Sequence, residues 1–249
     1  MTRLFGLDFT DAESVREVAD ACLSFEPTVG SKLPLLVTPN VDHLVQLRDA
    51  SAELVESTCE AAFVLPDGQP IVWASRLMGA RLPARLAGSD LFAELWPRIC
   101  DRRIPVLVIA PTAAVAEALD TAPSAATLVA PVFGADDLDA RSGLVDDALA
   151  AMTTPAAHVF VCLGQPKQQL IALELLERWP SERPPLVHCV GAAPEMYLGL
   201  VARAPEWMRR TGLEWFFRFL REPRRLFRRY FVDDVVFVKM VWKEWRSRR

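Results

Sequence analysis

Short apolar runs alternate with helical patterns along most of this chain of 249 residues. The apolar runs predict buried strands at residues 33–37, 62–65, 106–109, 128–132, 159–163 and 186–190. The stretches between them predict helices at residues 12–25, 41–60, 89–102, 112–121, 137–152 and 167–178. Strands that are apolar throughout and alternate with helices are typical of a parallel sheet with helices on both faces. The pattern therefore predicts an α/β fold, and it leaves the order of the strands open.

Charge divides the chain into two unequal parts. Residues 1–202 carry 14 Lys and Arg against 26 Asp and Glu, whereas residues 203–249 carry 14 against 6. The second part also holds 11 of the 22 aromatic residues. We therefore expect two domains, an acidic α/β body at residues 1–202 and a basic, aromatic helical appendage at residues 203–249. A segment of this composition suits contact with anionic groups, such as phosphates or lipid headgroups.

Composition argues against several classes of protein. The pI near 5.5 disfavours a dedicated nucleic-acid binder. The five cysteines and three histidines are scattered without a Cys-x-x-Cys spacing, which disfavours a disulfide framework and a structural zinc site. No run of 18 apolar residues and no signal-peptide pattern is present, so we expect a cytoplasmic protein. Three of the cysteines and histidines fall in predicted strands and are expected to be core residues: Cys162, Cys189 and His188.

Polar or glycine-containing turns follow four of the predicted strands. In parallel α/β sheets, ligands bind beyond the carboxyl ends of the strands. We therefore expect these four loops to converge on one cleft. They contain Thr38 and Asn40, Asp67 and Gly68, Gly164 and Gln165, and Gly191.

Asp67 is the strongest candidate for a catalytic group. It directly follows an apolar strand, within the sequence Leu65-Pro66-Asp67-Gly68. Burial raises the pKa of a carboxyl group toward the working pH, so a carboxylate at the lip of a cleft is suited to act as a general base. The alternative is an ordinary turn, since Pro-Asp-Gly is a favoured turn sequence.

Two further loops offer hydrogen-bonding groups. Thr38 and Asn40 provide a hydroxyl and an amide for a sugar or a phosphate, although Asn40 equally suits the N-cap of the next helix. The segment from Gly164 to Gln169 joins a strand to a helix, where glycine admits close approach and the helix N-terminus attracts anions. We expect Gln168 to face the cleft, and the alternative is a plain connection with solvent-facing polar residues. The chain contains neither a dinucleotide-binding fingerprint nor a P-loop.

Two predicted helix starts carry acidic residues. Asp137 and Asp139 are similar to the Asp-x-Asp by which many sugar-nucleotide transferases hold a metal. They lie at the start of a predicted helix, where the helix dipole favours acids, and we prefer that explanation. At the helix predicted for residues 89–102, we expect Ser89 or Asp90 to be the N-cap.

The basic appendage concentrates its arginines in one run. Arg218 and Arg221 are three residues apart and share a helical face, and Arg224 and Arg225 follow Pro223. Arginine binds phosphate oxygens through paired hydrogen bonds, and tryptophan and phenylalanine suit a lipid headgroup boundary. We therefore expect the appendage to contact phosphate groups or a membrane. The alternative is a solvated basic helix that packs its aromatic side chains on the body.

Six motifs follow one another in a defined order over residues 35–230. They are Thr38-Pro-Asn40, Leu65-Pro-Asp67-Gly68, Arg85-Leu-Ala-Gly88-Ser-Asp90-Leu, Gly164-Gln-Pro166-Lys-Gln168, Val190-Gly191, and the run from Arg203-Ala-Pro-Glu-Trp207 through Arg229. Together they resemble the bacterial glycosyltransferases of family 26, and the last run is the most specific. These enzymes add N-acetylmannosamine or N-acetylmannosaminuronic acid to a lipid-linked sugar in the synthesis of wall teichoic acid and enterobacterial common antigen.

The resemblance implies an inverting transfer from a UDP-sugar to a polyprenyl-diphosphate-linked N-acetylglucosamine. It also implies a Rossmann-like domain with a C-terminal helical appendage that reaches the inner face of the cytoplasmic membrane. The family is expected to work without a metal or another cofactor. The apolar surface of the appendage equally suits self-association into a homo-oligomer.

The resemblance also implies roles for individual residues. Asp67 would deprotonate the acceptor hydroxyl, and Arg85 would assist binding of the substrate or the leaving group. Thr38, Asn40 and Gln168 would line the site. Further substrate-binding residues would be Gly68, Gly164, Pro166, Gly191 and Glu195, and the residues in contact with a diphosphate or the membrane would be Arg203, Arg218, Arg221, Arg224 and Arg225.

Several positions depart from the family pattern. Gln169 stands where a glutamate is usual, and Ala110-Pro111 stand where two glycines are often found. Ala192 replaces a glycine, and Glu195 replaces an aspartate. The departures keep a rival function open, that of a non-catalytic module that holds a sugar nucleotide or an anionic lipid. A metal-dependent transferase that uses the Asp-x-Asp motif is a third possibility.

Overall fold

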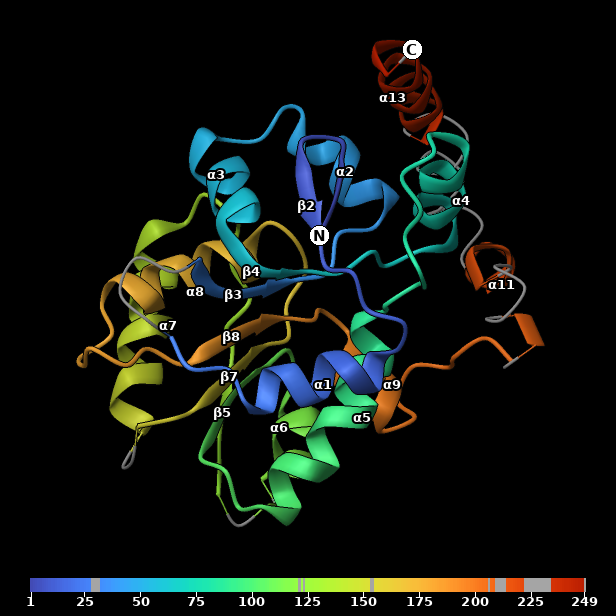
Figure 1. Cartoon of the computed structure of the whole chain (residues 1–249). Helices are drawn as coiled ribbons and strands as arrows, with labels where there is room; N and C mark the ends of the chain where they lie inside the picture. The colour runs from blue at the N-terminus through green and yellow to red at the C-terminus, as the bar shows by residue number, and fades with distance from the viewer. Residues whose placement is uncertain are drawn as a thin grey trace.

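A six-stranded parallel sheet forms the centre of the computed structural model, which describes residues 1–27, 32–120, 122, 124–152, 155–205, 207–208, 214–221 and 234–248. The strand order is β4-β3-β8-β7-β5-β6 (Figure 1). The strands are β3 (Leu33–Val37), β4 (Ala61–Val64), β5 (Val106–Ala110), β6 (Ala125–Val129), β7 (His158–Val161) and β8 (Leu186–Cys189). This arrangement confirms the predicted α/β fold, which is Rossmann-like.

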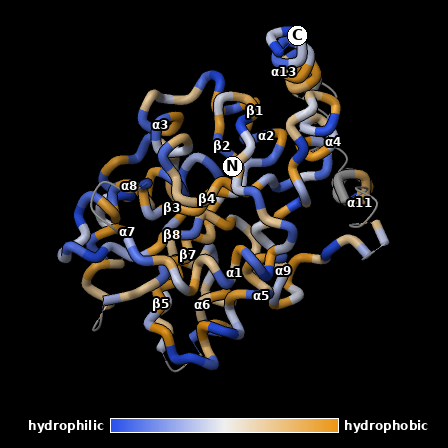
Figure 2. Tube along the Cα trace, viewed as in Figure 1, coloured by the Kyte–Doolittle hydropathy of each residue, from blue (hydrophilic) through white to orange (hydrophobic). Residues whose placement is uncertain are grey.

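Helices cover both faces of the sheet (Figure 1). One face carries α1 (Val15–Leu23), α5 (Gly88–Asp101), α6 (Ala113–Leu119) and α9 (Ala193–Tyr197). The other carries α2 (Val41–Leu47), α3 (Ala52–Glu60), α4 (Gln69–Leu77), α7 (Leu138–Ala151) and α8 (Lys167–Glu177). Successive strand residues such as Leu35 and Leu36 enter two separate hydrophobic clusters. Both sides of each central strand are therefore apolar, which explains the continuous apolar runs in the sequence (Figure 2).

An antiparallel hairpin precedes the sheet and pairs β1 (Thr2–Leu4) with β2 (Leu7–Phe9). Its two-residue turn places Phe5 and Gly6 at φ 53° and φ 80°. Positive φ at both central positions is the geometry that such a tight hairpin turn requires. The sequence analysis missed this hairpin, because its strands are only three residues long and give no clear periodicity.

The last helix packs against the start of the chain. The described C-terminal helices are α11 (Glu214–Arg221) and α13 (Asp234–Ser247). Phe237 on α13 is only 7% exposed, and its ring centroid lies 5.5 Å from that of Phe5. The Arg248 guanidinium donates to the carbonyl oxygen of Arg3 at 2.6 Å. Aromatic packing on the body, one alternative raised for the appendage, therefore holds for this helix.

Two predicted elements differ in the structure. The single helix predicted for residues 41–60 is two helices, because Ser51 caps α3 by accepting a hydrogen bond from the backbone N–H of Leu54. The strand predicted for residues 128–132 lies three residues earlier, as β6. Pairing with β5 selects the less apolar residues 125–129 at this sheet edge and leaves Val132 exposed. The helices α4 and α9 were not predicted.

Four neighbouring strands end level with one another. In register across the sheet, Val64 of β4 pairs with Val37 of β3, Val37 pairs with Cys189 of β8, and Cys189 pairs with Val161 of β7. The chain leaves the sheet just after this row. These are the same four strands whose loops the sequence singled out, so the sheet order brings those loops to one edge.

Two histidines meet inside the sheet. His158 Nδ1 lies 3.0 Å from His188 Nε2, and both side chains are buried. Burial lowers the pKa of His158 to about 4. Burial and, to a lesser degree, the neighbouring His158 lower the pKa of His188 well below its usual value. Both rings are therefore neutral core groups, as expected for His188.

We predict that this pair makes the fold sensitive to acid. An unfolded histidine binds a proton below about pH 6.5, whereas the buried rings do not, so stability falls as the pH decreases from 6.5 toward 4. At pH 5 the loss from His158 is about 2 kcal/mol, and His188 adds to it in the same direction. Urea denaturation at pH 7.5 and pH 5 measures it. The His158→Leu/His188→Leu variant should lose less stability between the two pH values, and a parallel loss in both proteins contradicts the prediction.

Candidate active site

The loops that follow β3 and β4 are bonded to one another at the edge of the sheet. The backbone N–H of Leu65 donates to the carbonyl of Val37 at 2.9 Å, and the N–H of Asp67 donates to the carbonyl of Pro39 at 3.1 Å. Asp67 is half-buried at this position. Gly68 follows with φ 143°, a conformation that side chains rarely adopt, and it directly precedes α4.

Asp67 belongs to the loop between β4 and α4, but its side chain contacts the N-terminus of α5. Its Oδ2 accepts a hydrogen bond from the backbone N–H of Gly88 at 3.4 Å, and the N–H of Leu86 donates to the carbonyl of Pro66 at 3.0 Å. Helix N-termini favour negative charge, so the position suits a carboxylate. The expected N-cap of this helix was wrong. The N-cap is Ala87, Asp90 lies in the first turn, and the Gly88 N–H is bonded to Asp67 from the loop after β4.

Gly88 allows α5 to approach β3 closely. A Cβ atom at this position would lie 3.1 Å from Cγ2 and 3.2 Å from Oγ1 of Thr38. The Thr38 hydroxyl donates to the carbonyl of Cys189 at 3.3 Å, which joins β3 to the end of β8. Thr38 is therefore packed between α5 and β8, and it holds the floor of the site together.

A second connection joins the loops after β7 and β8. Gly191 has φ 56°, and its backbone N–H donates to Oε1 of Gln168 at 2.9 Å. The N–H of Gln168 in turn donates to the carbonyl of Gly164 at 3.2 Å. Gln168 is thus buried at the edge of the sheet, with its amide oxygen on the Gly191 backbone. The space beside Gly164 is open, since no described atom lies within 4 Å of a Cβ built there, and Pro166 is the N-cap of α8.

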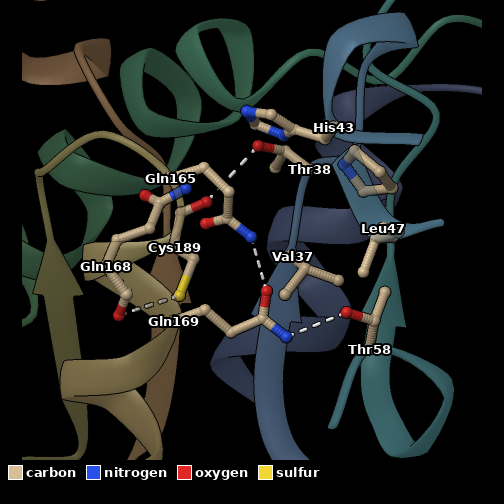
Figure 3. Close-up of a pocket in the computed structure, with 10 residues that line it drawn as sticks. Val37, Thr38, His43, Leu47, Thr58, Gln165, Gln168, Gln169 and Cys189 are labelled. Atoms are coloured by element: carbon tan, nitrogen blue, oxygen red, sulfur yellow. Dashed lines mark hydrogen bonds between the residues drawn. The ribbon is translucent and has the colours of Figure 1, made fainter. Parts of the chain in front are cut away.

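A narrow pocket lies among these loops (Figure 3). Its volume is about 10 Å³, close to that of one water molecule. Apolar and polar side chains line it together, from Val37, Thr38, Pro39, His43, Leu47, Thr58, Gln165, Gln168, Gln169 and Cys189. The sequence analysis did not single out His43. The available signal was Asn40, which accepts from the N–H of His43 at 3.1 Å and therefore places this ring in the first turn of α2. The N-cap alternative raised for Asn40 is confirmed.

Gln169 connects the pocket to α3. Its Nε2 donates to the carbonyl of Leu54 and to the hydroxyls of Ser57 and Thr58, at 3.1, 2.7 and 2.8 Å. A carbonyl oxygen only accepts, so the amide nitrogen of Gln169 must point to α3. Its Oε1 then accepts from Nε2 of Gln165 at 2.6 Å (Figure 3). An amide at this position satisfies the buried groups around it without placing a charge in the core.

Arg85 and Arg203 share one carboxylate. Arg85 Nη2 donates to Asp90 Oδ2 at 2.7 Å, and Arg203 donates to Asp90 Oδ1 and to the hydroxyl of Ser89. The expectation that Arg203 contacts a diphosphate or a membrane stays a prediction, and in the structure this side chain faces the first turn of α5.

The remaining expected site residues are placed as follows. Glu195 lies in the first turn of α9, and burial raises the pKa of its carboxyl group. Arg221 lies at the exposed end of α11, where its guanidinium is 5.1 Å from the ring centre of Phe217. Outside the described residues lie Arg224, Arg225 and the side chain of Arg218.

The Asp-x-Asp motif serves a helix. Asp137 is the N-cap of α7, and its Oδ1 accepts from the N–H of Ala140 at 3.1 Å. The helix-start explanation is therefore confirmed for this residue. Within the part of the chain that the structure describes, no group of three His, Cys, Asp or Glu could hold a metal ion.

We predict that Gly88→Ala loosens the contact between α5 and β3. The added methyl group must displace Thr38, so the free energy of unfolding should fall by roughly 1–3 kcal/mol. Thr38→Ser in the same chain removes the nearest atom and should restore part of the loss. Gly134→Ala is the matched control, because its Cβ meets no described atom within 4 Å. Equal thermal stability of Gly88→Ala and Gly134→Ala would contradict the prediction.

Comparison with known proteins places the chain among glycosyl transferases. The model of the glycosyl transferase WecG/TagA/CpsF family matches residues 2–249. A Bacillus subtilis protein named N-acetylglucosaminyldiphosphoundecaprenol N-acetyl-beta-D-mannosaminyltransferase is 32% identical over 167 residues, which are 66% of this chain and 62% of the relative. A Bacillus spizizenii protein of the same name is 28% identical over 221 residues, which are 88% of this chain and 82% of the relative. The match thus spans less than two thirds of the first relative, and the chain belongs to the WecG/TagA/CpsF family of glycosyl transferases.

Proposed function

We propose that this protein transfers N-acetylmannosamine, or a related sugar, from a UDP-sugar to a polyprenyl-diphosphate-linked sugar. The reaction would belong to the synthesis of a bacterial cell-surface polysaccharide. The observation that carries the proposal is the position of Asp67, whose carboxylate lies at the N-terminus of α5 where the loops of neighbouring strands meet. The names of the two relatives support the acceptor class, since both contain N-acetylglucosaminyldiphosphoundecaprenol.

The proposed reaction is a single displacement with inversion at the anomeric carbon. Asp67 takes the proton of the acceptor hydroxyl, and the oxygen attacks the anomeric carbon of the donor sugar. The bond between that carbon and the UDP oxygen breaks, and its electron pair leaves with UDP. A carboxylate is a suitable base for this step, provided that it is held within hydrogen-bonding distance of the hydroxyl.

Negative charge develops on UDP as it leaves, and cationic side chains stabilise such charge. Arg85 lies three residues before Gly88, where α5 begins, and its side chain is largely withdrawn from solvent. We assign it to the leaving group, together with arginines of the C-terminal segment such as Arg221. In this proposal the arginines take the part that a metal ion plays in other transferases, and addition of a chelator should leave the rate unchanged.

A second candidate function is binding of the same ligand without catalysis. The departures from the family pattern at Ala110-Pro111, Ala192 and Glu195 favour this candidate. It would be a non-catalytic module that holds a sugar nucleotide or an anionic lipid in a polysaccharide-assembly complex. The two functions differ in turnover, which the experiment with Asp67 measures directly.

The outer face of α13 suits a membrane surface. Val238 and Trp242 are one helical turn apart and are 65% and 57% exposed. Lys239, Lys243 and Arg246 lie on the same helix, and the Arg246 guanidinium is 4.6 Å from the ring centre of Trp242. Among the described residues, no helix has the length and apolar character needed to span a membrane. We propose that this face lies on anionic lipid at the cytoplasmic side of the membrane.

We predict that Asp67→Asn abolishes transfer and leaves donor binding intact. The amide cannot take the proton, so turnover should fall by about 10²–10⁴-fold. The measurement is UDP release from UDP-N-acetylmannosamine and a panel of other UDP-sugars. The acceptor is a short-chain polyprenyl-diphosphate N-acetylglucosamine analogue.

The outcomes of this experiment distinguish a transferase from a non-catalytic module and test Asp67 as the base. Release that needs the acceptor and is lost in Asp67→Asn supports the transferase and identifies its donor. Unchanged turnover in the variant excludes Asp67 as the base. UDP binding without release from any donor would favour the non-catalytic module.

We also predict that Val238→Glu/Trp242→Glu weakens membrane binding. Both side chains are exposed, so the fold should tolerate the change, while the loss of apolar contact and the added negative charge should lower binding by at least about tenfold. Cosedimentation with phosphatidylglycerol vesicles measures it. The control is Val132→Glu/Leu138→Glu, which changes two exposed apolar residues of the body. Equal loss in both variants would argue against a specific lipid-binding face.

A further inference from the structure

Asp90 is held between two parts of the chain that are far apart in sequence. Arg85 precedes it by five residues, whereas Arg203 follows it by 113. The three side chains are 15%, 21% and 22% exposed, in the order Arg85, Asp90 and Arg203. An ion pair that is this far withdrawn from water is screened less than a surface pair.

Among the described residues, two guanidinium groups, those of Arg85 and Arg203, contact the Asp90 carboxylate. Arg203 Nε is buried and has no hydrogen-bond partner among the described residues. Asp90 thus contacts both guanidinium groups at once. Loss of its charge would remove one ion pair from each of two partly buried cations, which is costly.

The same short stretch of chain also holds Asp67. Between Arg85 and Asp90, the N–H of Leu86 donates to the carbonyl of Pro66, and the N–H of Gly88 donates to the Asp67 carboxylate. Residues 85–90 are thus hydrogen-bonded both to Asp67, the proposed base, and to Arg203 at the beginning of the C-terminal segment. A continuous path of hydrogen bonds therefore connects Arg203, through Asp90 and the 85–90 backbone, to Asp67.

We infer that Asp90 is a positioning residue that couples the C-terminal segment, at Arg203, to the placement of the Asp67 carboxylate. The consequence for catalysis rests on the proposed function, whereas the mechanical coupling does not. Asp90 takes no part in proton transfer. It fixes the first turn of α5 relative to the loop that contains Asp67, and docking of the C-terminal segment thereby sets the geometry of the site.

Hydrogen exchange tests the coupling without any need for turnover. In the full-length protein, Asp90→Asn and Arg203→Gln should each speed amide exchange at residues 65–68 and 86–90. The double variant should exchange no faster than the single variants, because both changes break the same contact. Asp20→Asn is the matched control, since it removes the carboxylate that accepts from Arg98 of the same helix at 2.7 Å. Unchanged exchange at residues 65–68 in Asp90→Asn, or an equal increase in Asp20→Asn, overturns the inference.

Kinetics test the consequence for the site. A displaced base slows the chemical step, so Asp90→Asn should lower kcat about tenfold while KM for the UDP-sugar changes less than about twofold. Asp90→Glu keeps the charge and should recover part of the rate. A rise in KM at constant kcat would assign Asp90 to substrate binding and overturn its positioning role. Faster exchange in a protein that releases no UDP from any donor would support the coupling and reject the proposed function.

Discussion

The close approach of the α5 N-terminus to the loops after β3 and β4 positions the other groups of the site. Gly88 lets the helix start reach Thr38, because any larger residue would meet the threonine side chain at about 3.1 Å. The same turn presents a backbone N–H to Asp67 and carries Asp90 to Arg85 and Arg203. The first turn of α5 therefore contacts the candidate base Asp67, the buried Thr38 and Arg203 of the C-terminal segment.

Buried amides give the other half of the site its rigidity. Gln168 accepts from the Gly191 backbone, and Gln169 donates to three oxygen atoms of α3. Each contact satisfies a polar group that would be costly to bury alone. The hydroxyls of Ser57 and Thr58 donate to the Leu54 carbonyl, so their oxygen atoms accept from position 169. An amide supplies that donor and a glutamate carboxylate does not, which gives Gln169 a local explanation. It does not by itself argue against catalysis.

Described contacts join the C-terminal segment to the body at Arg203 and along α13. Arg203 contacts the first turn of α5, and Phe237 of α13 enters the core beside the N-terminal hairpin. The division into an acidic body and a basic appendage remains a prediction. The change in charge near residue 203 does not separate two independently packed parts, because side chains beyond it contact the body. Changes on the exposed face of α13 consequently test membrane contact better than removal of the whole segment, which would also remove a buried aromatic side chain.

The amino-acid pattern alone predicted the α/β class and the polar residues at the strand ends. Strands buried on both faces are apolar throughout, and that pattern is local. It also identified Asp67 and Gln168, because polar groups after such strands stand out. Strand order, the approach of Gly88 to Thr38 and the contacts of Asp90 were decided only by the tertiary structure. All three features bring together residues that are far apart in the chain. The partner of a side chain in such a contact depends on how the helices and strands pack, which neighbouring residues in the sequence do not reveal. Asp90 shows the difference, since its position favours a helix cap while the fold uses it to bind two arginines.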